Sequence, residues 1–374
     1  MTVNVCVFTG SRAEYGLLAP ILRAIRDHEA LTLHVLVGGS HVHAEFGATA
    51  QAITADGFDA CVYQSQHVPT IAGELAPNAE TIALTVLGVG RALQDLRPDW
   101  LLVYGDRCES FGAAIAATQA GVRLAHIEGG DVTEGGSLDD RVRYAISMLA
   151  DRHYPTHQAA ADRLVSMGIS QRNITVVGLP TLDSAVAGDM TPPAELRERY
   201  GLTGLPLYLV CYHPVRGLTP WLAGEVGAIV EALTPSVAKD RGHLIALAPN
   251  GEPGSATILS AYNAAGWPVH PSLPRRDYAA LLAYVGRCGG AVVGNSSAGI
   301  KEAPWHGARV INVGNRQRGR ACSPDVDRVM SVGGYDLTIA INSTGAGITT
   351  PAHTGPYQPM GAGAIVAQSL ATIR

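Results

Sequence analysis

The sequence predicts an α/β protein built from two doubly wound domains, and three observations carry this prediction. Short apolar runs alternate with longer amphipathic segments along the 374 residues. The apolar runs are continuous rather than alternating in polarity, which is typical of parallel strands that helices cover on both faces. The alternation stops around residues 183–205, where two prolines precede a short charged segment, and it restarts at Leu207.

The individual elements follow from this periodicity. Apolar runs predict strands at residues 3–8, 32–37, 100–104, 123–127, 174–177, 206–212, 243–248, 290–293 and 309–313. Amphipathic segments predict helices at residues 16–28, 78–96, 110–120, 139–150, 157–168, 194–200, 222–238, 275–285 and 299–306. We expect an N-terminal domain over residues 1–185 and a second domain over residues 186–355. The Gly- and Ala-rich tail, residues 356–374, predicts a final helix.

Composition and charge disfavour several classes of protein. Hydrophobic residues make up 47% and charged residues 16%, which suits a large core and not a disordered chain. The net charge of −5 lacks the basic footprint of a general nucleic-acid binder. No apolar run reaches the roughly 18 residues that span a bilayer, and the start of the chain does not resemble a signal peptide. Six scattered cysteines without a Cys-x-x-Cys pair indicate free thiols and a cytoplasmic protein.

Glycine and polar residues follow nearly every expected strand, at the point where the strand ends. In open parallel sheets, ligands bind beyond the carboxyl ends of the strands. We therefore expect a ligand cleft between two sheets that face each other, lined by turns from both domains. These turns are Thr9–Glu14, Gly38–His41, Gly105–Glu109, Glu128–Asp131, His213–Pro214, Pro249–Gly251, Gly294–Gly299 and Gly314–Arg316.

The turn Gly294–Gly299 has the pattern of a phosphate cradle. Ser296 and Ser297 stand where a helix begins, and backbone N–H groups at a helix start favour an anionic ligand. Glu302, one turn further, could accept hydrogen bonds from ribose hydroxyls. Ordinary helix capping by one of the serines explains the same pattern equally well. The turn is neither a Walker A loop nor a G-x-G-x-x-G fingerprint, which argues against a P-loop NTPase and a standard NAD site.

Charged residues follow three strands of the N-terminal half. Arg12 could grip a phosphate with two bonds, or it could be a surface residue beside Glu14. Asp106 and Glu128 are carboxylates at strand ends, and a carboxylate in a cleft can remove a proton from carbon. Asp106 could equally form a structural pair with Arg107.

Metal and hydrolase chemistry have little support in the sequence. His41 and His43 are two residues apart, without a further partner at metal-ligand spacing. A G-x-S-x-G elbow is missing from the sequence, which disfavours a serine hydrolase. His126 lies within an expected strand, where a core histidine is the favoured interpretation. We therefore expect no bound metal.

Taken together, these turns resemble the UDP-N-acetylglucosamine 2-epimerase family, most closely its hydrolysing, sialic-acid-pathway branch. The resemblance implies a GT-B-like fold, in which two Rossmann-like domains hold the sugar nucleotide between them and the C-terminal helix crosses back onto the N-terminal domain. It also implies a homodimer. The matching stretches keep the family order and are Thr9–Gly16, Gly105–Arg107, His126–Thr133, Asp139–Asp140, Tyr212–Val215, Pro249–Asn250, Leu273–Tyr278, Gly294–Pro304 and Arg316–Arg320.

The reaction that this resemblance implies has two stages and needs no cofactor. A base removes the proton from C2 of UDP-N-acetylglucosamine while UDP leaves C1, which gives 2-acetamidoglucal. In the hydrolysing branch, water then adds at C1 and N-acetylmannosamine is released. In the non-hydrolysing branch, UDP adds back and UDP-N-acetylmannosamine leaves.

The resemblance also assigns expected roles by position. Asp106 and Glu128 resemble the catalytic carboxylates, Asp140 is a further candidate near the sugar, and His213 resembles the residue that meets the departing phosphate. The segment 270–275 should hold the uracil. The other expected ligands belong to the diphosphate, the ribose or the rest of the nucleotide sugar, and they are Arg12, Arg107, Asn250, Ser296, Ser297, Gly299, Glu302 and Arg316.

Two departures from the hydrolysing pattern leave the outcome open. Tyr144 and Asp151 stand where that pattern has histidines, and tyrosine is a poor base at neutral pH because it titrates near pH 10. Leu17 replaces a lysine that many relatives carry. The alternatives are a non-hydrolysing epimerase and a relative that uses a GDP-linked diacetamido sugar. A GT-B glycosyltransferase and a non-catalytic sugar-nucleotide sensor are further alternatives.

Overall fold

The computed structural model describes residues 2–42, 50–62, 77–133, 139–215, 221–239, 242–249, 254–329, 335–342 and 352–372. Contacts within the chain divide it into two units, and the main boundary lies between Asp183 and Ser184. Unit 1 comprises Met1–Asp131, Leu138–Asp183 and Pro359–Arg374, and unit 2 comprises Val132–Ser137 and Ser184–Gln358. Each unit contains a six-stranded parallel sheet, which confirms the predicted α/β class with two doubly wound sheets.

Unit 1 is built on a sheet with the strand order β3-β2-β1-β4-β5-β6. The chain runs outward from β1 in one direction and from β4 in the other, so the switch point lies between these neighbours. The strands are β1 (Val3–Thr9), β2 (Leu31–Val37), β3 (Ala60–Val62), β4 (Trp100–Tyr104), β5 (Arg123–Ile127) and β6 (Arg152–Tyr154). The helices are α1 (Arg12–Arg26), α2 (Ala50–Ala55), α3 (Pro77–Leu96), α4 (Cys108–Ala120), α5 (Asp139–Leu149), α6 (Gln158–Ser166) and α14 (Ala362–Thr372). A further helix, α7 (Pro180–Val186), begins in unit 1 and ends in unit 2.

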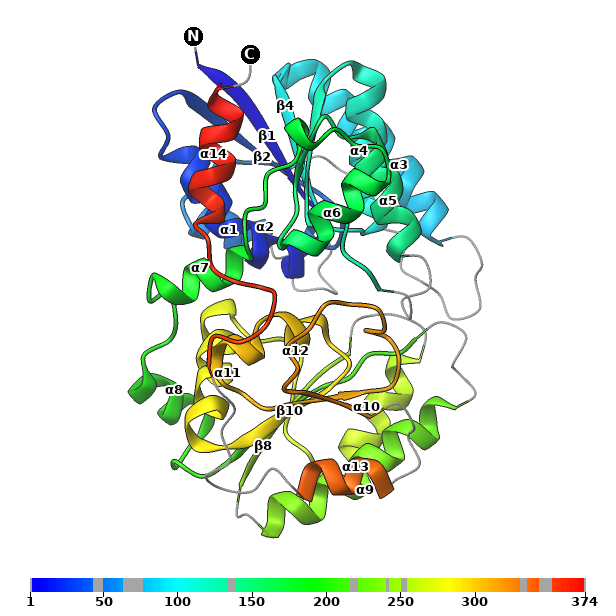
Figure 1. The fold of residues 1–374 in the computed structure, drawn as a ribbon, viewed down its shortest axis with the longest axis vertical. Coiled ribbons are helices and arrows are strands. Elements are labelled where there is room, and N and C mark those ends of the chain that lie inside the picture. Colours follow the sequence, from blue (N-terminus) through cyan, green and yellow to red (C-terminus); the bar gives the residue numbers. More distant parts are fainter. Residues whose placement is uncertain are drawn as a thin grey trace. The chain divides into compact units, whose positions relative to one another are not determined.

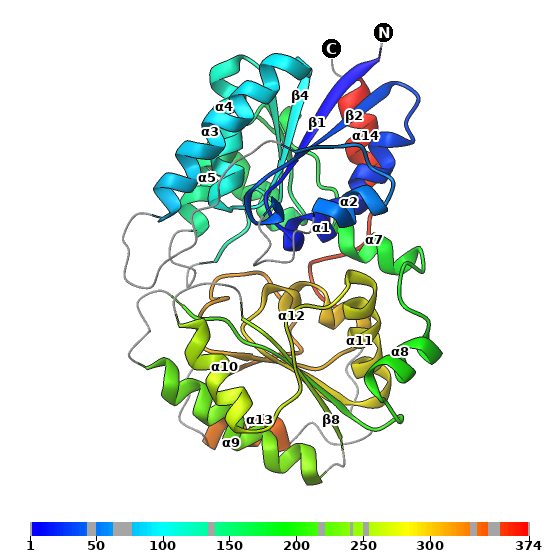
Figure 2. The same cartoon turned by 180° about the vertical axis from the view of Figure 1, so that it is seen from behind.

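Helices cover both faces of this sheet, which explains why its strands are apolar throughout (Figures 1 and 2). Val5 and Val7 of β1 point into a core that α1 and α14 close. Cys6 and Phe8, the alternate residues, point into the core beneath α3, α4 and α5. Side chains alternate along a strand, so one continuous run supplies both cores.

Unit 2 repeats the same topology, with the order β12-β11-β10-β7-β8-β9. Helices α9, α10 and α13 close its main core, and α11 and α12 contact the strands β7, β10 and β11. Its strands are β7 (Leu207–Cys211), β8 (His243–Leu247), β9 (Val269–His270), β10 (Gly290–Gly294), β11 (Val310–Val313) and β12 (Val326–Val329). Its helices are α8 (Pro193–Tyr200), α9 (Leu222–Lys239), α10 (Ser255–Ala264), α11 (Arg275–Cys288), α12 (Ser297–Lys301) and α13 (Tyr335–Asn342).

Short 3-10 helices occur in both units. They are η1 (Gly39–Val42) and η3 (Gln171–Asn173) in unit 1 and η4 (Ala303–His306) in unit 2.

The C-terminal helix α14 belongs to unit 1, although the residues before it belong to unit 2. It packs against α1 (Figure 1). The carboxylate of Asp183 accepts the backbone N–H groups of Gly361 and Ala362 at 2.8 and 2.6 Å, a favourable charge at a helix start. Tyr154 of β6 donates to Ser369 at 2.9 Å, which fixes the last turns of the helix on the sheet.

Two of the expected elements are wrong in detail. Residues 174–177 are not a regular strand, because Ile174 makes only an isolated bridge to His153 of β6. Thr175 and Val177 still donate to the carbonyls of His153 and Pro155, at 2.9 and 3.0 Å, but Pro155 has no N–H with which to return a bond. The helix expected at residues 299–306 divides into α12 and η4, because Pro304 cannot supply the next helical hydrogen bond.

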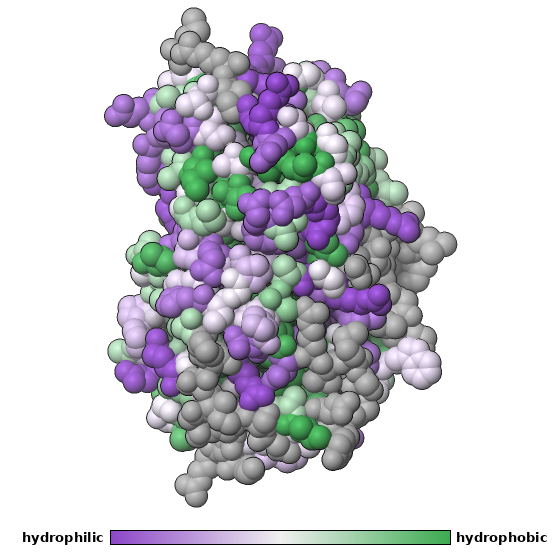
Figure 3. All heavy atoms as spheres, viewed as in Figure 1, coloured by the Kyte–Doolittle hydropathy of each residue, from purple (hydrophilic) through white to green (hydrophobic). Residues whose placement is uncertain are grey.

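Within the described part of the chain, no helix combines the length and the apolar character needed to cross a membrane. On the face drawn in Figure 3, hydrophobic residues form small groups among hydrophilic ones. Within the described part of the chain, Cys6, Cys108, Cys211, Cys288 and Cys322 form no disulfide bond.

Candidate active site

Arg143 of α5 joins acidic residues at the carboxyl edge of the unit 1 sheet. Its side chain is only 1% exposed. Its Nη2 bonds the carboxylate of Asp106, which follows β4, and its Nη1 bonds the carboxylate of Asp140 in the first turn of α5. Nη1 also donates to the carbonyl of Asp131 at 3.0 Å. A buried guanidinium between two carboxylates offsets their mutual repulsion and holds both in place.

The carboxylates of Asp106 and Asp140 remain accessible, with 26% and 22% of their side chains exposed. Asp106 therefore pairs with Arg143, and not with its neighbour Arg107 as the structural alternative predicted. Sequence reasoning missed Arg143. The available signal was its spacing, because a residue three positions after Asp140 on a helix lies on the same face.

Glu128 follows β5 and is held in an unusual backbone conformation. Its φ is +65°, which is uncommon for a residue other than glycine, and its side chain is buried. Its N–H donates to the carbonyl of Tyr154 at 3.0 Å. Gly130 also has a positive φ, and a Cβ there would lie 2.3 Å from the carbonyl oxygen of Ala160 on α6. The surrounding structure thus fixes this turn tightly, as is common where strain serves function.

His126 links the turn that carries Asp106 to the strand that precedes Glu128. It lies within β5 and is fully buried. Its Nε2 donates to the carbonyl of Gly105 at 2.8 Å, and its Nδ1 accepts from the hydroxyl of Ser147 at 3.0 Å. Burial lowers the pKa of His126 to about 3, so the ring is neutral at physiological pH. These contacts support the core interpretation of this histidine.

Tyr144 and Asp151, the two residues that stand where the hydrolysing pattern has histidines, lie in different parts of unit 1. Asp151 accepts from the N–H of Leu124 at 2.8 Å and donates its own N–H to the carbonyl of Leu124. Leu124 lies near the start of β5, about 10 Å along the strand from its carboxyl end. Tyr144 lies next to Arg143 on α5, and burial raises its pKa above the ordinary value. Tyr144 is therefore the departure near the carboxylates.

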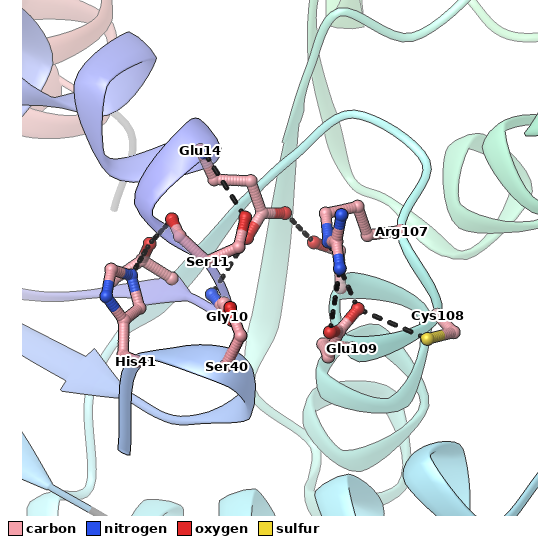
Figure 4. Close-up of polar contacts among 10 residues, drawn as sticks. Gly10, Ser11, Glu14, Ser40, His41, Arg107, Cys108 and Glu109 are labelled. Carbon is pink, nitrogen blue, oxygen red and sulfur yellow. Dashed lines mark hydrogen bonds and ion pairs between the residues drawn. The ribbon is translucent and has the colours of Figure 1, made fainter. Parts of the chain in front are cut away.

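Two arginines expected at the diphosphate lie at the starts of helices in unit 1. Arg12 is the first residue of α1, which Ser11 caps, and its side chain lies outside the described residues. Arg107 precedes α4 and is 41% exposed. It donates through Nε and Nη2 to the carboxylate of Glu109 at 3.2 and 3.0 Å (Figure 4). The Glu109 carboxylate raises the pKa of Arg107, which keeps its charge fixed.

Asn295 organises the carboxyl edge of the unit 2 sheet. Its side chain accepts from the N–H of His213 and donates to the carbonyl of the same residue, both at 2.8 Å. Its own carbonyl accepts from Arg316 at 3.1 Å and from Gln317 at 2.9 Å. Asn295 thus joins the ends of β7 and β10 to the turn after β11. Its sequence signal was its place in the turn Gly294–Gly299, but that pattern favoured the serines as ligands.

The turn Gly294–Gly299 begins at a position that requires glycine. Gly294 has φ +139°, and a Cβ there would lie 2.1 Å from the carbonyl oxygen of Cys211. Ser296 occupies the N-cap position of α12, but its side chain makes no capping hydrogen bond. Ser297 is the first residue of the helix, and Gly299 is buried within it. Ser296 therefore lies at the N-cap position that the capping interpretation predicts, but its side chain does not make the capping hydrogen bond.

Other residues expected at the nucleotide fall into two groups. Glu302 is buried, and Arg275 bonds both of its carboxylate oxygens. This pair connects the expected ribose contact to the segment 270–275 expected at the base. Asn250 lies outside the described residues.

The two histidines weighed as metal ligands do not form a described site. His43 lies outside the described residues, and His41 is buried, with its Nε2 3.0 Å from the hydroxyl oxygen of Thr9. Among the described residues, no group of three or more His, Cys, Asp or Glu could hold a metal ion.

Comparisons with known proteins identify the family of the chain. Residues 23–330 match the family model described as UDP-N-acetylglucosamine 2-epimerase. A UDP-N-acetylglucosamine 2-epimerase of Neisseria meningitidis serogroup B is 31% identical over 320 residues, covering 85% of this chain and 81% of that protein. The hydrolysing UDP-N,N'-diacetylbacillosamine 2-epimerase of Legionella pneumophila is 30% identical, covering 87% and 85%. A hydrolysing GDP/UDP-N,N'-diacetylbacillosamine 2-epimerase of Campylobacter jejuni is 26% identical, covering 85% and 82%.

Solved structures show the same fold. The UDP-GlcNAc 2-epimerase from Neisseria meningitidis, bound to UDP-GlcNAc, matches with a TM-score of 0.79 at 16% identity, covering 99% of this chain and 100% of that one. The Methanocaldococcus jannaschii enzyme in complex with UDP-GlcNAc and UDP matches with a TM-score of 0.74 at 14% identity, covering 98% and 99%. These matches confirm the GT-B-like fold of two Rossmann-like domains. The chain belongs to the UDP-N-acetylglucosamine 2-epimerase family.

Proposed function

We propose that this protein is a hydrolysing UDP-N-acetylglucosamine 2-epimerase, which converts UDP-N-acetylglucosamine and water into N-acetylmannosamine and UDP. The observation that carries the proposal is the arrangement of Asp106 and Asp140 on the buried Arg143, at the sheet edge where Glu128 also follows its strand. Carboxylates fixed in a partly dehydrated site suit the removal of a weakly acidic C–H proton.

In the first stage, Asp106 or Glu128 takes the proton from C2 of the sugar. The electron pair of the C2–H bond forms a double bond between C1 and C2, and the C1–O bond breaks as UDP leaves. In the second stage, the oxygen of water bonds to C1 and a proton returns to C2 from the opposite face. Arg143 positions the carboxylates throughout, because it bonds Asp106 and Asp140 together.

We propose that unit 2 binds UDP. Arg316 and His213, both bonded to Asn295, supply positive charge and hydrogen-bond donors for the diphosphate. Ser296, Ser297 and Gly299 form the turn and helix start at the same sheet edge. Glu302 accepts hydrogen bonds from the ribose, and Asn250 contacts the nucleotide or the sugar. Arg12 and Arg107 of unit 1 contact the diphosphate as well.

The place of Asp151 is compatible with the hydrolysing outcome. Its bonds to Leu124 put it toward the amino end of β5, away from the carboxylates, so this departure does not change the carboxyl edge of the sheet. Tyr144 can orient water as a hydrogen-bond donor, since its raised pKa keeps the phenol protonated.

A second candidate substrate is a UDP- or GDP-linked diacetamido sugar, with the same chemistry at C1 and C2. The observation in its favour is the similarity to two hydrolysing diacetylbacillosamine epimerases, at 30% and 26% identity. A homodimer and a cytoplasmic location, expected from the resemblance and the cysteine pattern, stay predictions that light scattering and fractionation can test.

The proposal is tested by the rate of UDP release from UDP-N-acetylglucosamine with Asp106→Asn. This variant keeps the shape of the side chain and removes its charge, and the rate should fall by about 10²–10⁴-fold. Asp95→Asn, at an exposed position of α3, is the matched control and should keep the native rate. Native release by Asp106→Asn would contradict the role of this carboxylate. No release by the native protein would contradict the substrate.

A further inference from the structure

Glu14 lies buried in the first turn of α1, where the sequence offered it only as a surface partner of Arg12. It is 4% exposed. Its Oε2 accepts the backbone N–H of Gly10 at 2.8 Å, and its Oε1 accepts the hydroxyl of Ser110 on α4 at 2.7 Å (Figure 4). Glu14 therefore ties the turn after β1 to the start of α4, and both partners that it bonds are electrically neutral.

A second buried carboxylate, that of Glu109, lies against the same turn. A Cβ on Gly10 would lie 2.8 Å from the Cβ of Glu109, so the two segments are in close contact. Arg107 donates twice to Glu109 and is the cation of this cluster. The thiol of Cys108 also donates to Glu109, at 3.2 Å. Glu109 thus takes the guanidinium, while Glu14 is left with an amide and a hydroxyl.

Among the residues whose side chains the structure describes, Cys108 and His41 also face this cluster, and both are uncharged near neutral pH. Burial raises the pKa of the Cys108 thiol, and burial lowers the pKa of His41 to about 4. With both carboxylates ionised, the described cluster carries two buried negative charges and one positive charge, that of the partly exposed Arg107. Burial raises the pKa of Glu14 to about 7. Burial also acts on Glu109, but the Arg107 guanidinium holds its pKa below the usual range.

Resting on the proposed function, in which Arg107 contacts the diphosphate, we propose that Glu14 is a positioning residue whose average proton occupancy rises when the sugar nucleotide binds. A diphosphate beside Arg107 adds negative charge and draws on the same guanidinium that compensates the carboxylates. The neutral form of Glu14 is then favoured. The proton comes from solvent and bonds to a carboxylate oxygen. The hydroxyl of Ser110, which donated to Glu14, then accepts from it.

Proton uptake makes nucleotide binding depend on pH in a way that a merely structural Glu14 would not. By linkage, a site that gains a proton on binding binds more tightly as the pH falls toward the pKa of the free protein. If binding raises the pKa of Glu14 from about 7 by about one unit, uptake at pH 7 is about 0.4 proton per ligand.

The test is isothermal titration calorimetry of UDP binding at pH 7, in two buffers of different ionisation enthalpy. The heat difference between buffers gives the number of protons taken up. Glu14→Gln keeps the shape and an acceptor oxygen but cannot titrate, and the proton change of UDP itself is common to both proteins. The native protein should take up about 0.4 proton more than Glu14→Gln. Equal uptake by the two proteins would overturn the proposal.

Ser110→Ala decides the matter independently if Glu14→Gln does not fold. This variant removes a hydrogen bond to the ionised carboxylate and leaves the Arg107–Glu109 pair intact, so the pKa of Glu14 should rise. The pH of maximal proton uptake should move upward by about one unit, and an unmoved maximum would contradict the role of Glu14. If UDP does not bind the native protein at all, the proposed function fails instead, so the two failures are distinguishable.

Discussion

His126 should make unit 1 sensitive to mild acid, and the size of the effect follows from its burial. The histidine has a pKa of about 3 in the folded protein and about 6.5 in an unfolded chain. Because the folded pKa is depressed, its stabilising contribution is present above pH 6.5 and is lost as the pH falls toward 3. Between pH 7.5 and 5.5 the unfolded chain gains nearly one proton and the folded protein almost none. The free energy of unfolding should therefore fall by about 1.4 kcal/mol from this residue alone.

The substitution His126→Gln isolates the contribution of His126 protonation to the free energy of unfolding. Glutamine keeps an N–H that can donate to the carbonyl of Gly105, but it has no charge to gain. Urea unfolding, followed by pulsed hydrogen exchange of β4 and β5, reports unit 1 separately from unit 2. The loss of stability between pH 7.5 and 5.5 should be smaller by about 1.4 kcal/mol in His126→Gln than in the native protein. His34→Gln, at a partly exposed position of β2, is the matched control. An unchanged pH dependence in His126→Gln would show that protonation of His126 does not destabilise unit 1.

Three further changes test the two sheet edges. Arg143→Met leaves the carboxylates of Asp106 and Asp140 without their cation, so kcat should fall at least 100-fold. Urea unfolding should show that unit 1 loses about 2–3 kcal/mol of stability. Arg141→Met, at an exposed position of the same helix, should match the native protein. Gly294→Ala places a Cβ 2.1 Å from a β7 carbonyl oxygen, at a position with φ +139°, and calorimetry should detect no UDP binding. Gly224→Ala, in open space on α9, is the control and should raise the Tm slightly, because alanine favours a helix more than glycine does. Asn295→Ala removes the link between β7 and β10, and the Kd for UDP should rise at least tenfold, with native affinity as the contradicting result.

Long buried strands are predictable from the sequence because both of their faces are covered. The apolar runs at β1, β4, β5 and β10 differ from the structure by at most one residue at either end. β6 is not predictable in this way, because its three residues are Arg, His and Tyr at the edge of the sheet. Its partners in the sheet, and not its composition, make it a strand.

Residues directly after a long strand are predictable as edge residues, because chain geometry alone puts them there. Asp106, Glu128 and His213 all follow strands that the sequence predicts. Asn295 also follows directly after a predicted strand, but its importance, like that of Arg143, lies in side-chain contacts that position alone does not reveal. These contacts join residues 37 positions apart for Arg143 and 82 for Asn295, and they depend on how helix and sheet pack.

We propose that the chain eliminates UDP from UDP-N-acetylglucosamine and then adds water. Proton and phosphorus NMR of the native protein with this substrate in D₂O distinguishes this reaction from the alternatives. We expect free UDP together with N-acetylmannosamine that carries deuterium at C2. Intact UDP-N-acetylmannosamine as the product would contradict the hydrolysing outcome, and the absence of both UDP release and deuterium uptake would contradict the proposed substrate.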